Sequence, residues 1–472
     1  MKSKSLFFIF LFTLSFFAKG QKISIAPALD VRNDDLFALI GQVGNKILTF
    51  ENSDKKYILN IFDSKLHRYT SRPLGFEKKK IRIISISHEP KTWVLVYSYI
   101  DKKNEIVNAY RYDNVGNRID SSQIIVRKRD LLERRFKFTE SEDEKQLLIF
   151  KKTSSKSVLF IRIDVEKLKA TYSKIVDFDK INFNTDFRMA LISNTGTFYT
   201  IFEKTPSIFN PSKHKLIVNA FTNDKEKAKS QTISIDYKIN NFTAKYDNIN
   251  NALNIVGVKS KQYSDKSNGY FVLRADEFIT QFKKTEKKYS LGLLKDFYRL
   301  RSKKIKNYIN NIHIKDILFR NDGGIIIVFE IKEIISRQNN DIHFRTRGFR
   351  SNIDYVFREL CIVSLHEDGD LFWHKIIPKH QFSSNDYGIY SSVFIFKTPS
   401  LLKIIFNDEI RDQNQIMMFS INPLGKSNRK SIFSTDLYNL NLAFNKSLQI
   451  SNNELIVPSY RNEKLRLVMI EF

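Results

Sequence analysis

The closest group of possible metal ligands in this 472-residue chain consists of His366, His374 and His380. Imidazole is a common zinc ligand, but a zinc site needs side chains whose spacing brings them onto one ion. These histidines straddle a predicted hairpin, and their spacing does not direct them to one metal. Asp177 and Asp179 form a D-x-D pair without the further oxygen ligands of a calcium loop. We therefore expect no metal site.

The sequence holds none of the common signatures of nucleophilic or phosphate chemistry. HExxH, GxSxG, paired CxxC, Walker and GxGxxG motifs are all missing. Glycine is scarce, at 15 residues, so few backbone positions could approach a phosphate closely. Gly369 stands four residues before Trp373, which resembles the turn-plus-tryptophan motif of quinoprotein propellers. The motif does not recur after Gly116 or Gly425, so we expect no quinone and no other cofactor.

Glycoside cleavage requires a different pattern, a pair of carboxylates roughly 5–9 Å apart. In a protein built from repeated units, the two carboxylates can come from different units, so spacing along the chain does not reveal them. Two or more carboxylates that converge with a Tyr or His at one mouth of a central channel would favour an enzyme. This criterion needs the folded structure.

The net charge of the chain is strongly positive. It has 78 Lys and Arg against 51 Asp and Glu, a formal charge of +27. Such a surface attracts polyanions, which include acidic proteins, anionic lipid headgroups, acidic polysaccharides and nucleic acid. No specific nucleic-acid partner is expected. The alternative is compositional, because abundant Lys, Asn, Ile and Phe is typical of AT-rich genomes and the lysines then only solvate the surface.

Two basic clusters in the second half of the chain are candidate parts of a docking surface. The candidate binding residues are Arg299, Arg301, Lys303, Lys304, Lys306, Arg345, Arg347 and Arg350. The first five accompany a predicted helix, and the last three lie in a predicted loop. We expect them to contact a protein partner or an anionic component of the cell envelope, so that any membrane contact is indirect or made through surface charge.

An acidic or Asn-containing turn between two β-rich runs recurs about every fifty residues. Such a period indicates a repeated β unit, and the predicted helix and loop lie within this repeat. The turns are marked by Asp63, Asp113, Asp164, Asp224, Asp276, Asp368 and Asn422. Each unit reads as four strands, and the second strand tends to be continuously apolar, as expected for a strand covered on both faces. The pattern predicts an all-β fold, a β-propeller of about eight four-stranded blades. Seven blades are the alternative if the first unit is not a full blade.

The step from Asp276 to Asp368 is longer than the others and predicts two insertions. Residues 290–312 alternate apolar and basic positions with a helical period, which predicts a helix. Residues 338–351 are polar and Arg-rich and predict an inserted loop between two long strands. The irregular part of the ring is therefore expected within residues 290–351.

The last unit has only three predicted strands, and the N-terminus supplies a spare one. The three are Ser447–Ile450, Glu454–Arg461 and Lys464–Phe472, and the spare strand is Lys22–Leu29. Letting the spare strand complete the last blade closes the ring and removes two exposed edges. Residues 21–472 are then expected to form one propeller domain.

Residues 1–20 have the pattern of a secretory signal peptide. Lys2 and Lys4 precede the short apolar run Leu6–Phe17, and small residues stand before the expected cleavage point. We expect an exported protein, either periplasmic or associated with the outer membrane, with secretion as the alternative. Cys361 is the only cysteine, so no internal disulfide can form, and its apolar surroundings predict burial.

Residues 322–408 resemble a family of exported, largely uncharacterised propeller-like proteins of Bacteroidota. The stretches that carry the resemblance are Asp322–Glu330, Leu360–Leu365, Trp373–Gln381, Tyr390–Phe394 and Ile404–Asp408. They combine a DGG turn, an apolar strand and a following Glu. Within that group, a soluble protein of similar size plugs the periplasmic end of the export pore of the type IX secretion translocon. The resemblance implies a non-enzymatic role near such an outer-membrane export machine.

Two hypotheses of function follow. The first is a non-enzymatic envelope propeller that binds a protein or scaffolds an assembly through a basic surface. The second is a hydrolase or lyase acting on an acidic polysaccharide, with its carboxylates gathered at the central channel. The missing catalytic motifs favour the first hypothesis, and the arrangement of carboxylates at the channel tests the second.

Overall fold

The computed structural model describes eleven stretches of the chain. They are residues 22–30, 36–53, 56–78, 80–129, 135–178, 181–205, 214–222, 228–260, 266–337, 352–410 and 413–472. The predicted signal peptide (1–20) and the predicted inserted loop (338–351) lie outside these stretches. Within them, no helix has the length and apolar character that a membrane crossing requires.

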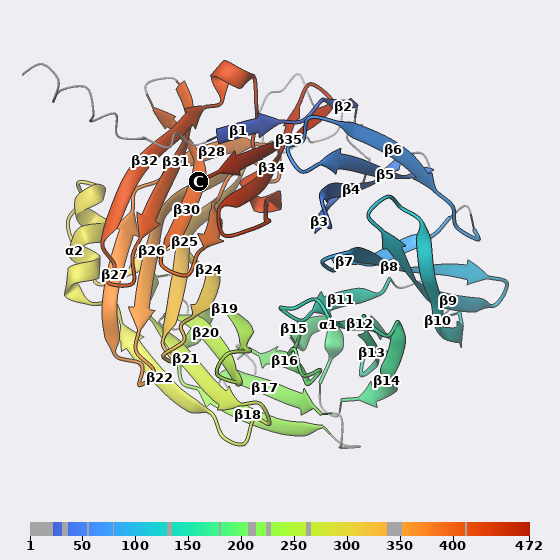
Figure 1. Cartoon of the computed structure of the whole chain (residues 1–472). Helices are drawn as coiled ribbons and strands as arrows, with labels where there is room; N and C mark the ends of the chain where they lie inside the picture. The colour runs from blue at the N-terminus through green and yellow to red at the C-terminus, as the bar shows by residue number, and fades with distance from the viewer. Residues whose placement is uncertain are drawn as a thin grey trace, which may run out of the picture.

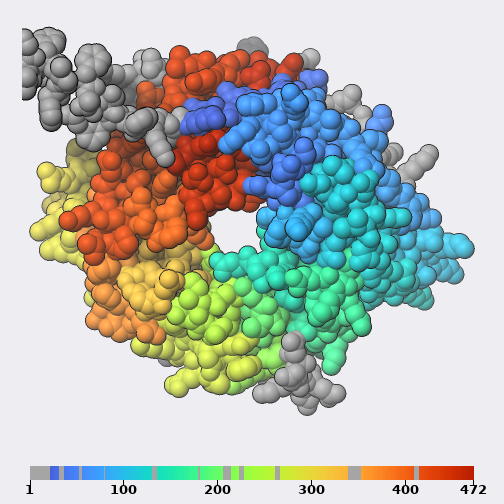
Figure 2. Space-filling model, viewed as in Figure 1, coloured from blue at the N-terminus to red at the C-terminus, as the bar shows by residue number. Residues whose placement is uncertain are grey.

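Eight antiparallel sheets surround a central opening, so the fold is an eight-bladed β-propeller (Figures 1 and 2). Each blade has four main strands, and in blades 1 to 7 they follow one another along the chain from the innermost strand outward. The prediction of an all-β propeller with eight blades is confirmed, and the seven-bladed alternative is wrong.

The first four blades follow the predicted period. Blade 1 contains β3 (Leu36–Val43), β4 (Lys46–Ser53), β5 (Lys56–Asp63) and β6 (Tyr69–Leu74). Blade 2 contains β7 (Arg82–His88), β8 (Thr92–Asp101), β9 (Asn104–Asp113) and β10 (Arg118–Lys128). Blade 3 contains β11 (Lys137–Glu140), β12 (Gln146–Lys152), β13 (Ser157–Asp164) and β14 (Lys169–Asp177). The short helix α1 (Phe183–Asp186) leads into blade 4, which contains β15 (Phe187–Ile192), β16 (Phe198–Lys204), β17 (His214–Phe221) and β18 (Lys229–Ile235).

The second half of the ring carries the additions. Blade 5 contains β19 (Lys238–Asp247), β20 (Ala252–Ser260), β21 (Lys266–Asp276) and β22 (Lys283–Lys288), and β23 (Ile309–Asn310) also pairs with β21. Blade 6 contains β24 (Ile312–Phe319), β25 (Ile325–Arg337), β26 (Asn352–Leu365) and β27 (Leu371–Ile377), and β28 (Gln381–Ser384) also pairs with β26. Blade 7 contains β29 (Phe394–Lys397), β30 (Leu402–Ile410), β31 (Gln413–Ile421) and β32 (Ser427–Ser434). Two short 3-10 helices, η2 (Asp436–Tyr438) and η3 (Phe444–Lys446), lead to blade 8.

Blade 8 is closed by the N-terminal segment, as the sequence predicts. It contains β33 (Leu448–Gln449), β34 (Glu454–Arg461), β35 (Lys464–Glu471) and, as its outermost strand, β1 (Lys22–Ile25). The antiparallel register runs from Lys22 opposite Glu471 to Ile25 opposite Val468, and β2 (Leu29–Asp30) continues along β35. The outer edge of β35 is therefore covered by the first described residues of the chain.

The repeated acidic turn connects the third and fourth strands of a blade and has a clear physical cause. The Asp63 carboxylate accepts hydrogen bonds from the backbone N–H groups of Lys65, His67 and Arg68. Asp113 and Asn422 accept backbone N–H groups of their own turns in the same way. A short side chain with an oxygen acceptor is favoured here because it satisfies donors that the strands leave unpaired. Asp224 lies outside the described residues.

Two inner strands were not predicted. The first unit gains β3 and the sixth gains β24, so both blades are complete. Gly41 interrupts the apolar run of β3, with a φ of 124° and a register shift beside it. β24 begins at Ile312, the last residue of the predicted helix, so the sequence offered no gap in which to look for a strand.

The predicted helix over residues 290–312 is wrong in its second half. Helix α2 spans Leu291–Leu300, and the hydroxyl of its N-cap Ser290 accepts the N–H of Leu293 at 3.2 Å. The helix stops because Ser302 adopts a left-handed φ of 51° and the N–H of Lys303 donates to the Tyr298 carbonyl at 3.1 Å. The lysines that follow belong to an irregular segment that leads into β23.

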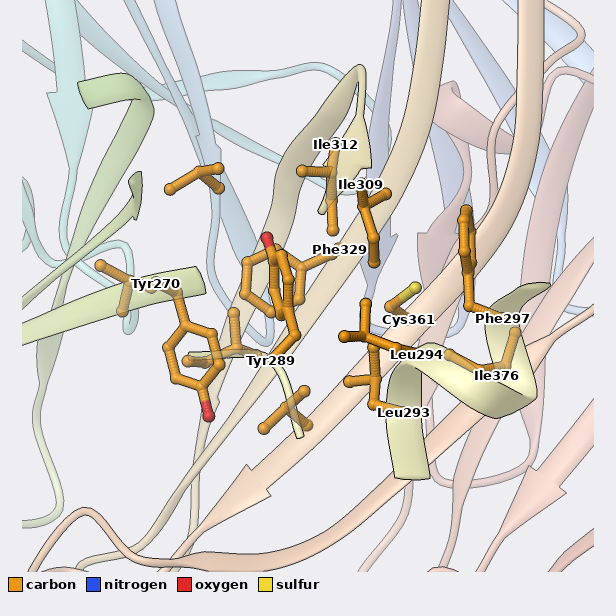
Figure 3. Packing of buried hydrophobic residues seen from close by; sticks show 14 of the residues in the cluster. Tyr270, Tyr289, Leu293, Leu294, Phe297, Ile309, Ile312, Phe329, Cys361 and Ile376 are labelled. Atoms are coloured by element: carbon orange, nitrogen blue, oxygen red, sulfur yellow. The ribbon is translucent and has the colours of Figure 1, made fainter. Parts of the chain in front are cut away.

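Helix α2 lies outside blade 6 beside β27 (Figure 1) and completes the largest apolar cluster. Leu293, Leu294 and Phe297 point toward Cys361 and Ile376 from the strands of blade 6 (Figure 3). Cys361 is 1% exposed, and burial raises the pKa of its thiol, so the predicted burial of this cysteine is confirmed. The thiol is inert in this setting.

One face of the ring carries the turns between the first and second and between the third and fourth strands; we call it the hairpin face. At this face, hydrogen bonds of 2.7–3.3 Å cross every boundary between neighbouring blades. They join Gly44 N to Pro90 O, His88 N to Glu144 Oε2, Asp143 N to Asn194 Oδ1, Asn194 N to Asn248 Oδ1, Asn250 Nδ2 to Arg320 O, Trp373 Nε1 to Pro423 O, Lys397 N to Gln449 Oε1 and Lys65 Nζ to Glu471 Oε1. The blades are thus linked all the way around.

Candidate functional site

The innermost strands of the blades border the opening that runs through the ring (Figures 1 and 2). At the hairpin face, blades 1, 2 and 8 form a hollow of 240 Å³. It is lined by Gln42, Gly44, His88, Pro90, Gln449 and Ile450. Of these side chains, His88 is the one that can exchange a proton near neutral pH.

His88 is oriented by a carboxylate of the next blade. Its Nδ1 lies 2.9 Å from Glu144 Oε2, and the same oxygen accepts the His88 backbone N–H at 2.9 Å. The hydrogen bond with Glu144 raises the pKa of His88. Burial opposes ionisation of Glu144, but the bonds from His88 outweigh it and lower the pKa of the carboxyl.

The two opposite pKa shifts confine the charged pair to a window of pH. The contribution of His88 to stability is complete below its unfolded pKa of about 6.5 and is lost as the pH rises through the higher folded value. The contribution of Glu144 is complete above its unfolded pKa of about 4.5 and is lost as the pH falls through the lower folded value. The pair therefore stabilises the fold most between these pH values, and only modestly because both side chains are about one-third exposed.

A second carboxylate stands beside this pair. Glu140 accepts the hydroxyl of Ser87 at 2.9 Å and also that of Ser85, both from β7 of the preceding blade. Burial raises the pKa of Glu140 against the two serine hydrogen bonds, which lower it. An imidazole oriented by one carboxylate, next to a carboxyl that holds its proton more tightly, is a pairing that acid–base catalysis uses.

The same groups also have a structural role. Glu140 and Glu144 join blade 3 to blade 2, as other hydrogen bonds join the remaining boundaries of the hairpin face. The criterion of two carboxylates that converge with a His is therefore met by His88, Glu140 and Glu144. The hydrogen bonds of these residues also fasten two blades together. The geometry thus supplies proton-exchanging groups at a channel mouth, and the same groups fasten blade 2 to blade 3.

Elsewhere around this mouth the charges are mixed in sign. Lys245 Nζ lies 3.1 Å from Asp316 Oδ1, across the boundary between blades 5 and 6. Glu142 accepts the amide of Asn248 at 3.0 Å. The mouth is therefore not a uniformly cationic ring for polyanions.

Among the predicted binding residues, Arg301 has an internal partner. Its guanidinium donates to both carboxylate oxygens of Glu359, at 3.0 and 2.6 Å, and lies 4.5 Å from the ring centre of Phe297. Such a two-pronged contact fixes the segment after α2 to blade 6. Arg301 is thus engaged inside the fold.

The other cations near α2 are exposed and lie among exposed aliphatic side chains. We call this surface the α2 patch; it consists of Arg299, Leu300, Lys303, Lys304, Ile305 and Lys306. Leu300 is 48% exposed and Ile305 is 47% exposed. In the described part of the chain, no carboxylate forms an ion pair with the four cations of the patch. The remaining predicted residues, Arg345, Arg347 and Arg350, lie outside the described residues.

The structure does not bring His366 and His374 of the predicted histidine group together at one site. The ring of His366 packs at a tilt against that of Phe372, with 4.6 Å between ring centres, whereas His374 Nε2 lies 3.1 Å from Asp296 of α2. Across the described stretches, no three His, Cys, Asp or Glu side chains are arranged to hold a metal ion. Asp177 accepts the hydroxyl of Ser157, and Asp179 is not described.

Sequence patterns could not reveal the channel-mouth cluster. His88 ends one inner strand, and Glu140 and Glu144 flank the first turn of the next blade, more than fifty positions away. The acidic run Glu140–Glu144 was the available signal, but acidic residues in a short turn are commonly solvated. Only the ring geometry brings the run against His88.

Among the solved structures that resemble the chain are several β-propellers. No model of a protein family and no curated protein matches the chain. The β-propeller domain of the Trilobed protease from Pyrococcus furiosus is 11% identical, with a TM-score of 0.38 over 84% of this chain and 98% of that one. The polysaccharide lyase Uly1 is 7% identical, with a TM-score of 0.40 over 83% and 90%. The Nup133 propeller of Vanderwaltozyma polyspora is 12% identical, with a TM-score of 0.39 over 83% and 100%. At TM-scores below 0.5, these likenesses carry no argument about function.

Proposed function

We propose that the chain is a non-enzymatic, exported propeller that docks a protein partner in the cell envelope through the α2 patch. The observation that carries the proposal is the combination of cations that form no ion pair in the described residues with two exposed aliphatic side chains in one short segment. Cations guide an acidic partner to the surface, and apolar side chains supply the area that leaves water on binding. The partner is therefore an acidic protein surface with an apolar depression.

The rigid backing of the patch supports a docking role. α2 buries its apolar face in the core, and the contact between Arg301 and Glu359 fixes the segment that follows. A preorganised surface loses less conformational entropy when it binds. The pattern of residues 1–20 and the resemblance of residues 322–408 support the proposal that this docking occurs in the envelope, near an outer-membrane export machine such as the type IX translocon.

Charge reversal in the patch provides a test with a matched control. Lys303→Glu/Lys304→Glu is expected to weaken partner binding about tenfold or more, because two attractive charges become repulsive. Lys102→Glu/Lys103→Glu changes the same charge at two exposed lysines in the turn between β8 and β9, across the ring from α2 (Figure 1). Tagged wild-type and variant proteins would be recovered from envelope extract, and the co-purified protein titrated against each.

The control variant is expected to keep the partner. If both double variants lose it equally, the binding depends on overall charge and the α2 patch is not the docking surface. If no acidic protein co-purifies with the wild type, the proposed function is wrong.

A second candidate is a hydrolase or lyase for an acidic polysaccharide, and the convergence of His88, Glu140 and Glu144 favours it. The wild type should then cleave a uronate-containing glycan. Glu140→Gln and His88→Asn should each reduce that cleavage about a hundredfold or more, because each removes a proton-exchanging group. Cleavage would be followed by release of reducing ends or of unsaturated products, with the melting temperature as a check on folding. An inactive wild type across uronate glycans, or fully active variants, would exclude an enzymatic role for the cluster.

A further inference from the structure

A groove of 680 Å³ opens between the outer parts of blades 3 and 4, away from both the α2 patch and the channel mouth. One wall is β14, the outermost strand of blade 3. The other wall is a face of blade 4, where alternate residues of β17 and β18 point into the groove. These wall residues include Lys215, Asn219, Ser230 and Thr232. The volume of the groove falls within the range of ligand-binding pockets.

The floor of the groove is apolar and firmly supported. Phe178, Ile181 and Phe221 line it, and each is at most 7% exposed. Phe178 packs against Phe202, and Phe221 stacks on Phe198 with 4.5 Å between ring centres. The floor therefore belongs to the core and does not need to move to receive a ligand.

The rim carries an excess of positive charge. Lys174, Lys204 and Lys215 line the groove, against one carboxylate, Asp177, which accepts the hydroxyl of Ser157. Lysines around an apolar floor attract a ligand that has both acidic and apolar groups. A purely apolar ligand would make no use of the charges of Lys174 and Lys215.

The free edge of β14 identifies the kind of ligand. β14 pairs with β13 on one side, and no strand in the described stretches pairs with its other edge. Residues from both faces of the strand line the groove, Tyr172, Lys174 and Val176 from one and Ile175 and Asp177 from the other. The groove therefore runs along the edge itself, where backbone N–H and C=O groups await partners.

We infer that the groove binds an extended acidic segment of another protein, which adds as a strand to the edge of β14. Backbone hydrogen bonds would hold the segment, and its alternate side chains would meet the lysines and the apolar floor. An anionic glycan would satisfy the lysines but could not form the ladder of backbone hydrogen bonds. This inference concerns a different surface from the α2 patch and does not depend on the proposed function.

A synthetic peptide of about seven residues that alternates Glu with Val tests the inference on the whole protein. Its ends would be acetylated and amidated, and binding would be followed by calorimetry at low salt. Binding is expected, and Lys174→Glu/Lys215→Glu should weaken it at least tenfold, while Lys102→Glu/Lys103→Glu should leave it nearly unchanged. A peptide with Lys in place of Glu should not bind.

Two further measurements separate strand addition from simple charge attraction. Amide hydrogen exchange within residues 172–176 should slow when the peptide binds, and a peptide with a central Pro should bind at least tenfold more weakly, because Pro has no N–H to donate. Absence of binding, equal binding of the Pro peptide, unchanged exchange in β14, or preference for a polyuronate oligosaccharide would each overturn the inference.

Discussion

Replacement of residues 22–30 by a Gly-Ser linker of equal length is expected to lower the free energy of unfolding by about 5 kcal/mol. The segment places Ala26 and Leu29 in the core at 3% and 8% exposure and half-buries Ile23 and Ile25. Burial of one large aliphatic side chain stabilises a fold by roughly 1.5–3 kcal/mol, which gives the expected sum. Denaturant unfolding followed by tryptophan fluorescence would measure the loss.

Loss of this segment also exposes the outer edge of β35, so we expect the variant to self-associate as well as to be less stable. A suitable control is Asp30→Ser, because the Asp30 side chain is 91% exposed and its loss should change stability by less than about 0.5 kcal/mol. If the linker variant has the same midpoint denaturant concentration as the wild type, the closing strand does not stabilise the ring and the prediction is wrong.

The substitution Lys379→Met is expected to cost about 3–5 kcal/mol of stability, since it leaves a buried carboxylate without its counter-charge. Lys379 Nζ lies 2.9 Å from Glu330 Oε1, and the exposed fractions of the two side chains are 0% and 5%. Ser392 donates to the other oxygen of Glu330 at 2.7 Å. Burial lowers the pKa of Lys379 despite the attraction of Glu330, which shows how costly the charge is in this position.

A double variant distinguishes the loss of a charge partner from the loss of packing. Lys379→Met/Glu330→Met removes both charges and keeps similar volume, so it should recover at least half of the stability lost in Lys379→Met. The three proteins would be compared by denaturant unfolding at one pH. If the double variant is less stable than Lys379→Met by the full cost of a second buried substitution, the two side chains act independently.

The period of the turns was sufficient to predict the fold, because it has a local physical cause. Asp63 and Asp113 each bind backbone N–H groups within a few residues, so their positions are visible in the sequence. The closure by Lys22–Leu29 was also predictable, since one strand was missing at one end and one was spare at the other. Long-range pairing could be inferred here from counting alone.

The inner strand β24 and the end of α2 could not be predicted in this way. Helix α2 ends where Ser302 turns into the left-handed region, and Arg301 then binds Glu359 of a distant strand, a contact that no local signal in the sequence marks. The approach of Glu144 to His88 likewise depends on how neighbouring blades meet. The exposure of the α2 patch, in contrast, could be expected from its lysines. The helical conformation predicted for those lysines is wrong.

The closing strand has a further consequence for the order in which the protein can form. β1 is synthesised before all the blades, whereas its partner β35 lies about 450 residues further along the chain and is made after them. Blades 1 to 7 can each form as soon as their own four strands have been synthesised, but the last blade must wait. Until then the early segment has to remain unpaired and available, so its commitment to a wrong partner is the error against which a cell that makes this protein must guard.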